Sequence, residues 1–129
     1  MSGPSAWLID GNNVMGSRPD GWWRDKRGAA RRLVGELADF AAREGVPVTV
    51  VFDGAPFEVE IPSGVPLEVA FAARRGRDAA DDEIARRVGA AADPAALTVV
   101  TSDAGLARRV GERGAELVPA GRFRRGLVQ

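Results

Sequence analysis

The chain has 129 residues, and its 18 basic and 18 acidic side chains cancel to a net charge of zero. This length is typical of one domain with its own core, and the balanced charge creates no global field that would favour a nucleic acid or a membrane. The absence of cysteine excludes disulfides, thiolate metal sites and cysteine nucleophiles, and the absence of histidine excludes histidine acid–base catalysis and serine triads.

Other functional classes lack support as well. Lys26 is the only lysine, and it does not follow a glycine-rich phosphate loop. The N-terminal residues lack the charged and apolar regions of a signal peptide, and no apolar run approaches the ~20 residues of a membrane span. We therefore expect a cytoplasmic protein without a membrane segment. If it is an enzyme, its chemistry has to rely on carboxylates, and we expect a metal ion beside them.

Apolar stretches of strand length alternate with helical patterns along the chain. The strand candidates, in chain order, are residues 6–10, 46–54, 66–73, 97–103 and 115–120. Helical spacing of apolar residues predicts helices over Leu33–Ala41 with Gly45 as the stop, over Ile84–Ala91, and over Leu106–Val110. Nearly continuous apolar strands that alternate with helices predict an α/β fold, in which a parallel sheet is covered on both faces.

The sequence shows no internal repeat and no interdomain linker, so we expect a single domain over residues 1–129. Residues 14–28 contain Gly, Pro and two tryptophans and are interpreted as a loop with a poorly defined helix start. Residues 56–66 are a second irregular connection. The core is expected to cover about residues 6–120, and residues 121–129 are expected to form a basic, mobile tail.

Three of the predicted strands end in an acid, namely Asp10, Asp53 and Asp103. In a parallel sheet the carboxyl ends of the strands lie along one edge, where ligands bind, so we expect the three acids to share that edge. Carboxylates gathered in this way repel one another, and a cation relieves the repulsion. Oxygen ligands without His or Cys favour hard ions, so the sequence predicts Mg²⁺ or Mn²⁺. Such ions lower the pKa of a bound water and so replace a histidine base.

A further group of acids opens the helix in the stretch RDAADDEIARRV. If Asp78 caps this helix, Asp81 lies three residues before Ile84 and continues the buried stripe towards the sheet. Asp82 is rotated by about 100° and is expected to face solvent beside Arg86 as an ion pair.

Each acid also has an ordinary structural interpretation. Asp82 and Glu83 are explained well as first-turn acids that complement the helix dipole. Asp103 could cap the next helix, and Asp53 could be a turn residue before a glycine. Asp10 is harder to explain as a turn residue, because it is followed by a glycine and two asparagines. The joint pattern is stronger than any of its members.

Two clusters of side chains could contact a nucleic acid. The first is Trp22 and Trp23 with Arg24, Lys26 and Arg27, and the second is Arg74, Arg75 and Arg77. The tryptophans could stack on bases, although covering core surface is the more common role of tryptophans in a long loop. The three later arginines either hold a backbone phosphate near the metal or form a solvated run.

Four stretches, in this order, resemble the NYN domain family of PIN-like ribonucleases, and within it the bacterial YacP-like group. They are LIDGNNVMG (8–16), VVFDG (50–54), ADDEI (80–84) and VVTSD (99–103). The resemblance extends from Ala6 to about Ala120. It implies a PIN-like three-layer α/β sandwich with parallel strand order 3-2-1-4-5 and metal-dependent endoribonuclease activity.

The resemblance also implies roles for individual residues. Catalytic and metal-binding acids fall on Asp10, Asp81 and Asp103, and supporting or substrate-binding residues fall on Asn12, Asn13, Asp53 and Ser102. Asp81 is expected to bind metal or to orient the attacking water, and Asn13 to position the scissile phosphate or to fix Asp10. Related domains often carry an aromatic residue where this chain has Asn12. RNA is the expected partner, and by analogy the ribosome could present it.

Two other functions stay open at this stage. The first is a non-catalytic RNA-binding or ribosome-associated module with the same fold. The second is a phosphohydrolase of the haloacid dehalogenase type, which also places an Asp after its first strand. That chemistry needs a second Asp where this chain has Asn12, and a lysine for which Lys26 is poorly placed, so it is the less favoured of the two.

Overall fold

A five-stranded sheet forms the centre of the protein. The computed structural model describes residues 5–72 and 79–127. The strands are β1 (Ala6–Asp10), β2 (Val48–Asp53), β3 (Leu67–Ala72), β4 (Leu97–Val100) and β5 (Glu116–Val118). They pair in parallel in the order β3-β2-β1-β4-β5, which confirms the predicted fold class and strand order. All five carboxyl ends therefore point towards one edge.

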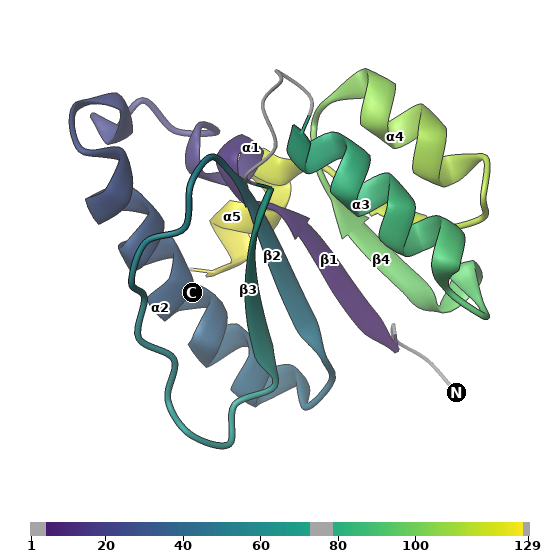
Figure 1. Cartoon of the computed structure of the whole chain (residues 1–129), viewed down its shortest axis with the longest axis horizontal. Coiled ribbons are helices and arrows are strands. Elements are labelled where there is room, and N and C mark those ends of the chain that lie inside the picture. The colour runs from purple at the N-terminus through teal and green to yellow at the C-terminus, as the bar shows by residue number, and fades with distance from the viewer. Residues whose placement is uncertain (1–4, 73–78, 128–129) are drawn as a thin grey trace.

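Helices cover both faces of the sheet. They are α1 (Gly11–Met15), α2 (Lys26–Glu44), α3 (Ala79–Ala90), α4 (Ala104–Gly111) and α5 (Ala120–Leu127), with 3-10 turns at Trp22–Arg24 and Pro94–Ala96. The helices α2 and α5 lie on one side of the sheet and α3 and α4 on the other, with α1 at the carboxyl edge (Figure 1).

The inner strands β1, β2 and β4 are largely apolar because both of their faces are buried. In β1, Ile9 points into the cluster beneath α2 and α5, and its neighbour Leu8 points into the cluster beneath α3 and α4. Val50 and Val51 of β2 divide between the two clusters in the same way. Side chains alternate along a strand, so two hydrophobic layers require a hydrophobic residue at every position.

Residues 14–28 are more regular than expected. The short helix α1 extends into them as far as Met15, and α2 already begins at Lys26. The side chain of Asp25 accepts a hydrogen bond from the backbone N–H of Gly28 at 3.0 Å, and this cap fixes the start of α2. The aspartate was a readable capping signal, but glycine in the first turn obscured the helical pattern.

Gly11 is required by the close packing of α1 on β2. A Cβ atom at this position would lie 2.6 Å from two atoms of the Phe52 ring and 2.9 Å from a methyl carbon of Val50. The helix begins directly after β1 and passes over the neighbouring strand without a spacer. The glycine of the first motif therefore serves close packing.

The expected mobile tail is wrong over residues 121–127, which belong to α5. Ala120, Phe123 and Leu127 are buried at helical spacing, and the Phe123 ring packs 5.1 Å from Phe40 and 5.7 Å from Trp7 between ring centres. The sequence pattern did not reveal this helix because its three buried residues are separated by arginines and glycines. Residues 128–129 lie outside the described part of the chain.

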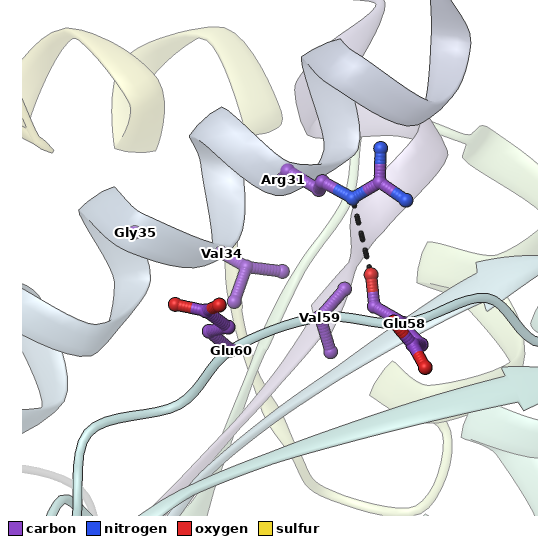
Figure 2. A pocket seen from close by; sticks show the side chains of 6 residues that line it. All are labelled: Arg31, Val34, Gly35, Glu58, Val59 and Glu60. Atoms are coloured by element: carbon purple, nitrogen blue, oxygen red, sulfur yellow. Dashed lines mark hydrogen bonds between the residues drawn. The ribbon is translucent and has the colours of Figure 1, made fainter.

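The connection from β2 to β3 has no helix or strand over residues 55–66, as expected. It runs beside α2, where the Arg31 Nε donates to the carbonyl oxygen of Glu58 at 3.1 Å (Figure 2). A pocket of about 440 Å³ lies between this connection and α2. Figure 2 shows the residues that line it, which are Arg31, Val34, Gly35, Glu58, Val59 and Glu60.

Candidate active site at the carboxyl edge of the sheet

Three of the predicted site acids lie together at the carboxyl edge. Asp10 is the last residue of β1, Asp53 is the last residue of β2, and Asp103 follows β4 by three residues. They are close enough for the charges of Asp53 and Asp103 to raise the pKa of Asp10. Negative charge is therefore concentrated at the carboxyl ends of β1 and of its two neighbours in the sheet, β2 and β4.

Asp10 is the most enclosed of the three. Its side chain is only 4% exposed, and burial, the largest cause, raises its pKa to about 6. The Thr101 hydroxyl donates to Oδ2 at 2.9 Å and the Asn13 backbone N–H donates to Oδ1 at 3.4 Å, and both bonds oppose the rise. A nearby cation would therefore stabilise the ionised form of the Asp10 carboxyl group, which burial disfavours.

Thr101 is a site residue that sequence reasoning missed. It is buried, its hydroxyl donates to Asp10, and the same oxygen accepts the backbone N–H of Asp103 at 3.1 Å. This one hydroxyl connects two of the acids. The signal was available in the stretch VVTSD, but the threonine was interpreted as the continuation of a strand.

The two asparagines of the first motif join strand ends. Asn12 Oδ1 accepts the backbone N–H of Asp53 at 2.8 Å, and Asn13 Oδ1 accepts the backbone N–H of Ser102 at 2.7 Å. The first bond reaches β2 and the second reaches the chain after β4. The Ser102 hydroxyl oxygen in turn accepts the N–H of Ala120, at the start of α5. These side chains hold the loops of the edge in register with β1.

Each of the three acids also accepts a backbone N–H at the start of a helix. Asp10 does so for α1, Asp53 Oδ1 accepts from Ala80 of α3 at 2.9 Å, and Asp103 Oδ1 accepts from Leu106 of α4 at 2.9 Å. The capping interpretation of Asp103 is therefore confirmed, and Asp53 caps a helix far away in the sequence. Helix N-termini favour negative charge, so they stabilise carboxylates here.

The helix α3 carries the remaining predicted acids. Ile84 and Val88 are fully buried, which confirms the apolar stripe of this helix. Asp81 and Asp82 are both partly buried, so the orientation of Asp81 towards the sheet stays a prediction from helical spacing. The predicted ion pair between Asp82 and Arg86 is wrong, because Arg86 pairs with Glu83 at 2.6 Å. Asp82 instead pairs with Arg109 of α4 at 2.9 Å, so it faces the neighbouring helix.

The acids do not form a closed cage for a metal ion. Within residues 5–72 and 79–127, no group of three or more acidic side chains is arranged so that it could hold a metal ion. Arg74, Arg75 and Arg77 and the expected helix cap Asp78 lie outside the described residues. The metal set of Asp10, Asp81 and Asp103 thus stays a prediction.

Arg124 is the second residue that sequence reasoning missed. Its guanidinium donates to the carbonyl oxygens of Val14 at 3.3 Å and Met15 at 2.8 Å, and to the Asp20 carboxylate at 2.9 Å. It therefore binds the C-terminal end of α1 and the loop that follows. The sequence pattern placed Arg124 among the basic residues of a tail, and only the packing of α5 gives it this role.

A comparison with protein families identifies the chain. The sequence profile of the YacP-like NYN domain matches residues 7–129, which is nearly the whole chain. The protein belongs to this family. A UPF0178 protein of Rhodopseudomonas palustris (strain BisB18) is 46% identical over 88 residues, which are 67% of this chain and 51% of the relative. The chain thus spans about half the length of this curated relative.

Solved structures of a family member have the same fold. A mutant form of Rae1 (YacP) from Bacillus subtilis superposes with a TM-score of 0.74 at 26% identity, over 96% of this chain and 75% of that one. A second crystal structure of Rae1 gives a TM-score of 0.71 at 23% identity, over 99% and 74% of the two chains. The fold is of the ribonuclease type, as the resemblance implied. In the described part of the chain, the helices are too short or too polar to cross a membrane.

The raised pKa of Asp10 predicts how stability depends on pH when metal is removed by a chelator. Below the ordinary pKa of 3.8 the group is protonated in both the folded and the unfolded chain. Between 3.8 and about 6 only the unfolded chain ionises, so the free energy of unfolding falls as the pH rises. Above about 6 the loss is complete and amounts to about 3 kcal/mol for a shift of about two units.

Asp10→Asn cannot ionise, so its stability relative to the wild type should increase by about 3 kcal/mol between pH 3.5 and pH 7.5. Urea unfolding with chelator at both pH values measures this. Asp39→Asn, which removes an exposed acid of α2, is the matched control and should show no such increase. A difference between Asp10→Asn and wild type that stays constant with pH would contradict the burial argument.

Proposed function

We propose that this protein is a metal-dependent endoribonuclease that hydrolyses RNA phosphodiesters at the carboxyl edge of its sheet. The observation that supports this most is the buried Asp10, whose charge interacts with Asp53 and Asp103 and whose carboxylate shares Thr101 with the loop of Asp103. Membership of the YacP-like NYN family supports a nuclease activity. The chain contains no histidine, so hydrolysis needs another source of acid–base chemistry.

The donor set of the edge fits a hard divalent cation. Asp10 and Asp103 offer carboxylate oxygens, and Asp81 follows Ala80, whose backbone N–H binds Asp53. The chain has no histidine or cysteine that could add a nitrogen or thiolate ligand. Mg²⁺ is usually bound by one or two carboxylates together with waters and substrate phosphates, so it does not require a cage of three protein acids. When bound, Mg²⁺ or Mn²⁺ would polarise the phosphoryl oxygen and lower the pKa of the attacking water.

The surrounding residues hold these acids in place. Thr101 fixes the orientation of Asp10 from one side, and Asn13 binds the backbone of Ser102, which precedes Asp103. Asp53 caps α3 at Ala80, next to Asp81, and thereby determines where this helix begins. Asp53 and the asparagines are therefore proposed to position the catalytic acids, with Asn12 bonded to β2 and unavailable as a stacking surface.

The second candidate is a non-catalytic RNA-binding or ribosome-associated module. One observation favours it: Asp10, Asp53 and Asp103 each have a structural role at a helix start, which is reason enough for an acid at these positions. Cleavage assays separate the two candidates, because a binding module would leave RNA intact whatever metal is added.

The first prediction from the proposed function concerns metal and products. Single-stranded RNA should be cut only when Mg²⁺ or Mn²⁺ is present, and Asp10→Asn or Asp103→Asn should abolish cutting and weaken the stabilisation by metal. Attack by water leaves 5′-phosphate and 3′-hydroxyl ends. A 5′-phosphate-dependent exonuclease should therefore degrade the fragments.

Two outcomes would show that the site is misassigned. One is fragments that end in 2′,3′-cyclic phosphates, and the other is a folded double variant, with both Asp10→Asn and Asp103→Asn, that cuts RNA at the wild-type rate. Asp39→Asn serves as the control.

The second prediction compares adjacent acids of α3. Helical spacing predicts that Asp81 continues the stripe that faces the sheet, whereas Asp82 pairs with Arg109 on α4. Asp81→Ala should reduce kcat/KM at least about tenfold more than Asp82→Ala, which corresponds to 1.4 kcal/mol of transition-state stabilisation. Steady-state kinetics on one RNA oligonucleotide, together with thermal unfolding of both variants, measures the difference. Equal losses in two well-folded variants would mean that Asp81 has no role in the reaction.

A further inference from the structure

Trp23 is an exposed aromatic side chain on the 3-10 turn that precedes α2. It is 49% exposed, and among the described residues only Ile61 and Leu117 are other large hydrophobic side chains with high exposure. Its neighbour Trp22 packs against the core and meets the Trp23 ring edge to face, with 6.0 Å between ring centres. The two tryptophans therefore differ: Trp22 covers core surface and holds Trp23, whose ring is left largely open to solvent.

Three basic side chains of the same segment each lie over an aromatic ring, and one of these rings is that of Trp23. The guanidinium of Arg24 lies 5.9 Å from the centre of the Trp23 ring. The ammonium of Lys26 lies 6.0 Å from the centre of the Trp22 ring. Arg27 lies 5.5 Å from the Phe57 ring. All three basic residues are exposed. We call Trp23, Arg24, Lys26 and Arg27 the Trp23 platform.

The acidic residues of the same segment are engaged in internal bonds. Asp25 caps α2 through Gly28, and Asp20 binds Arg124 at 2.9 Å. Glu58 and Glu60 of the connection between β2 and β3 line the pocket beside Arg31, one turn after Arg27 on α2 (Figure 2). Asp25 keeps its negative charge, but the three exposed basic side chains of the platform outnumber it and leave a net positive charge.

The platform lies close to the carboxyl edge. A Cβ atom on Gly16, which ends α1, would be 3.5 Å from the Trp22 ring. The helix α1 has five residues and rises by only about 7 Å, so Trp22 is close to the helix that Asp10 caps. Arg124 binds both the end of α1 and Asp20, and it holds the loop between them. Platform and candidate site are thus fixed to one short helix.

We propose that the Trp23 platform binds single-stranded RNA beside the site, with a base stacked on Trp23 and phosphates held by Arg24, Lys26 and Arg27. An exposed aromatic ring among basic side chains is the usual arrangement in proteins that bind single strands without sequence preference. A duplex keeps its bases stacked internally, so it cannot use the ring. Binding of RNA to the platform is independent of the proposed function. The further step, in which the bound strand leads to a cleavage site, rests on the proposed function.

Binding is measured by fluorescence anisotropy of a labelled ten-nucleotide oligouridine, with chelator present so that cleavage does not enter. Trp23→Ala should weaken binding roughly 5- to 150-fold, the range for loss of one stacked base. Trp23→Phe should restore most of it. Lys26→Ala and Arg27→Ala should each reduce the slope of log K against log salt by about 0.7.

Two variants provide matched controls. Arg43→Ala removes the same charge near the other end of α2, and Leu117→Ala removes an exposed hydrophobic side chain from β5. Neither should change the dissociation constant by more than about twofold.

The proposal is overturned if Trp23→Ala binds as tightly as Leu117→Ala, or if a duplex binds as tightly as the single strand. It is also overturned if the wild type does not bind the oligonucleotide, in which case the exposed ring would point to a protein partner. Weak binding by Trp23→Ala in a protein that never cuts RNA would support the platform and contradict the proposed function. Normal binding by Trp23→Ala in a protein that cuts RNA would do the reverse.

Discussion

The hydrogen bond from the Thr101 hydroxyl to the buried Asp10 carboxylate is the interaction on which the carboxyl edge depends. A carboxylate that is 4% exposed is costly unless hydrogen bonds or a cation compensate for its lost hydration. Thr101 and the first turn of α1 supply part of that compensation, and the raised pKa shows that they do not supply all of it. A divalent cation bound at this strand end would supply the remaining stabilisation of the ionised carboxylate.

The side chains of this edge combine structural and functional roles. Asp53 and Asp103 start helices, and Asn12 and Asn13 join β1 to the chain after β2 and β4. The same bonds restrict the positions of the carboxylates, and a catalytic site needs its groups held by such secondary contacts. The family profile matches residues 7–129, which include all of these side chains, and Rae1 shares the fold.

The sequence pattern was sufficient to predict the parallel sheet and the shared edge of Asp10, Asp53 and Asp103, and the resemblance to the NYN family supplied the strand order. Strand period, strand–helix alternation and the geometry of parallel sheets are local or topological rules, so they can be applied without coordinates. The bond from Thr101 to Asp10, the bonds of Arg124 to α1 and the pairing of Asp82 with Arg109 were missed, because each joins residues that are distant in sequence. The helix α5 was missed because three buried residues among arginines and glycines give a weak pattern, which packing on Trp7 and Phe40 completes.

The proposed hydrolysis requires a divalent cation at the carboxyl edge. A crystal structure of the protein grown with Mn²⁺ at about pH 7.5 tests this requirement most directly. Anomalous scattering at the manganese edge locates the ion independently of any assumed geometry. We expect an anomalous peak within bonding distance of the Asp10 and Asp103 carboxylates, and we expect this peak to be lost in crystals of Asp10→Asn. An edge without a peak at saturating Mn²⁺, or a peak that persists in the variant, would contradict the metal site and leave the acids with their helix-capping role alone.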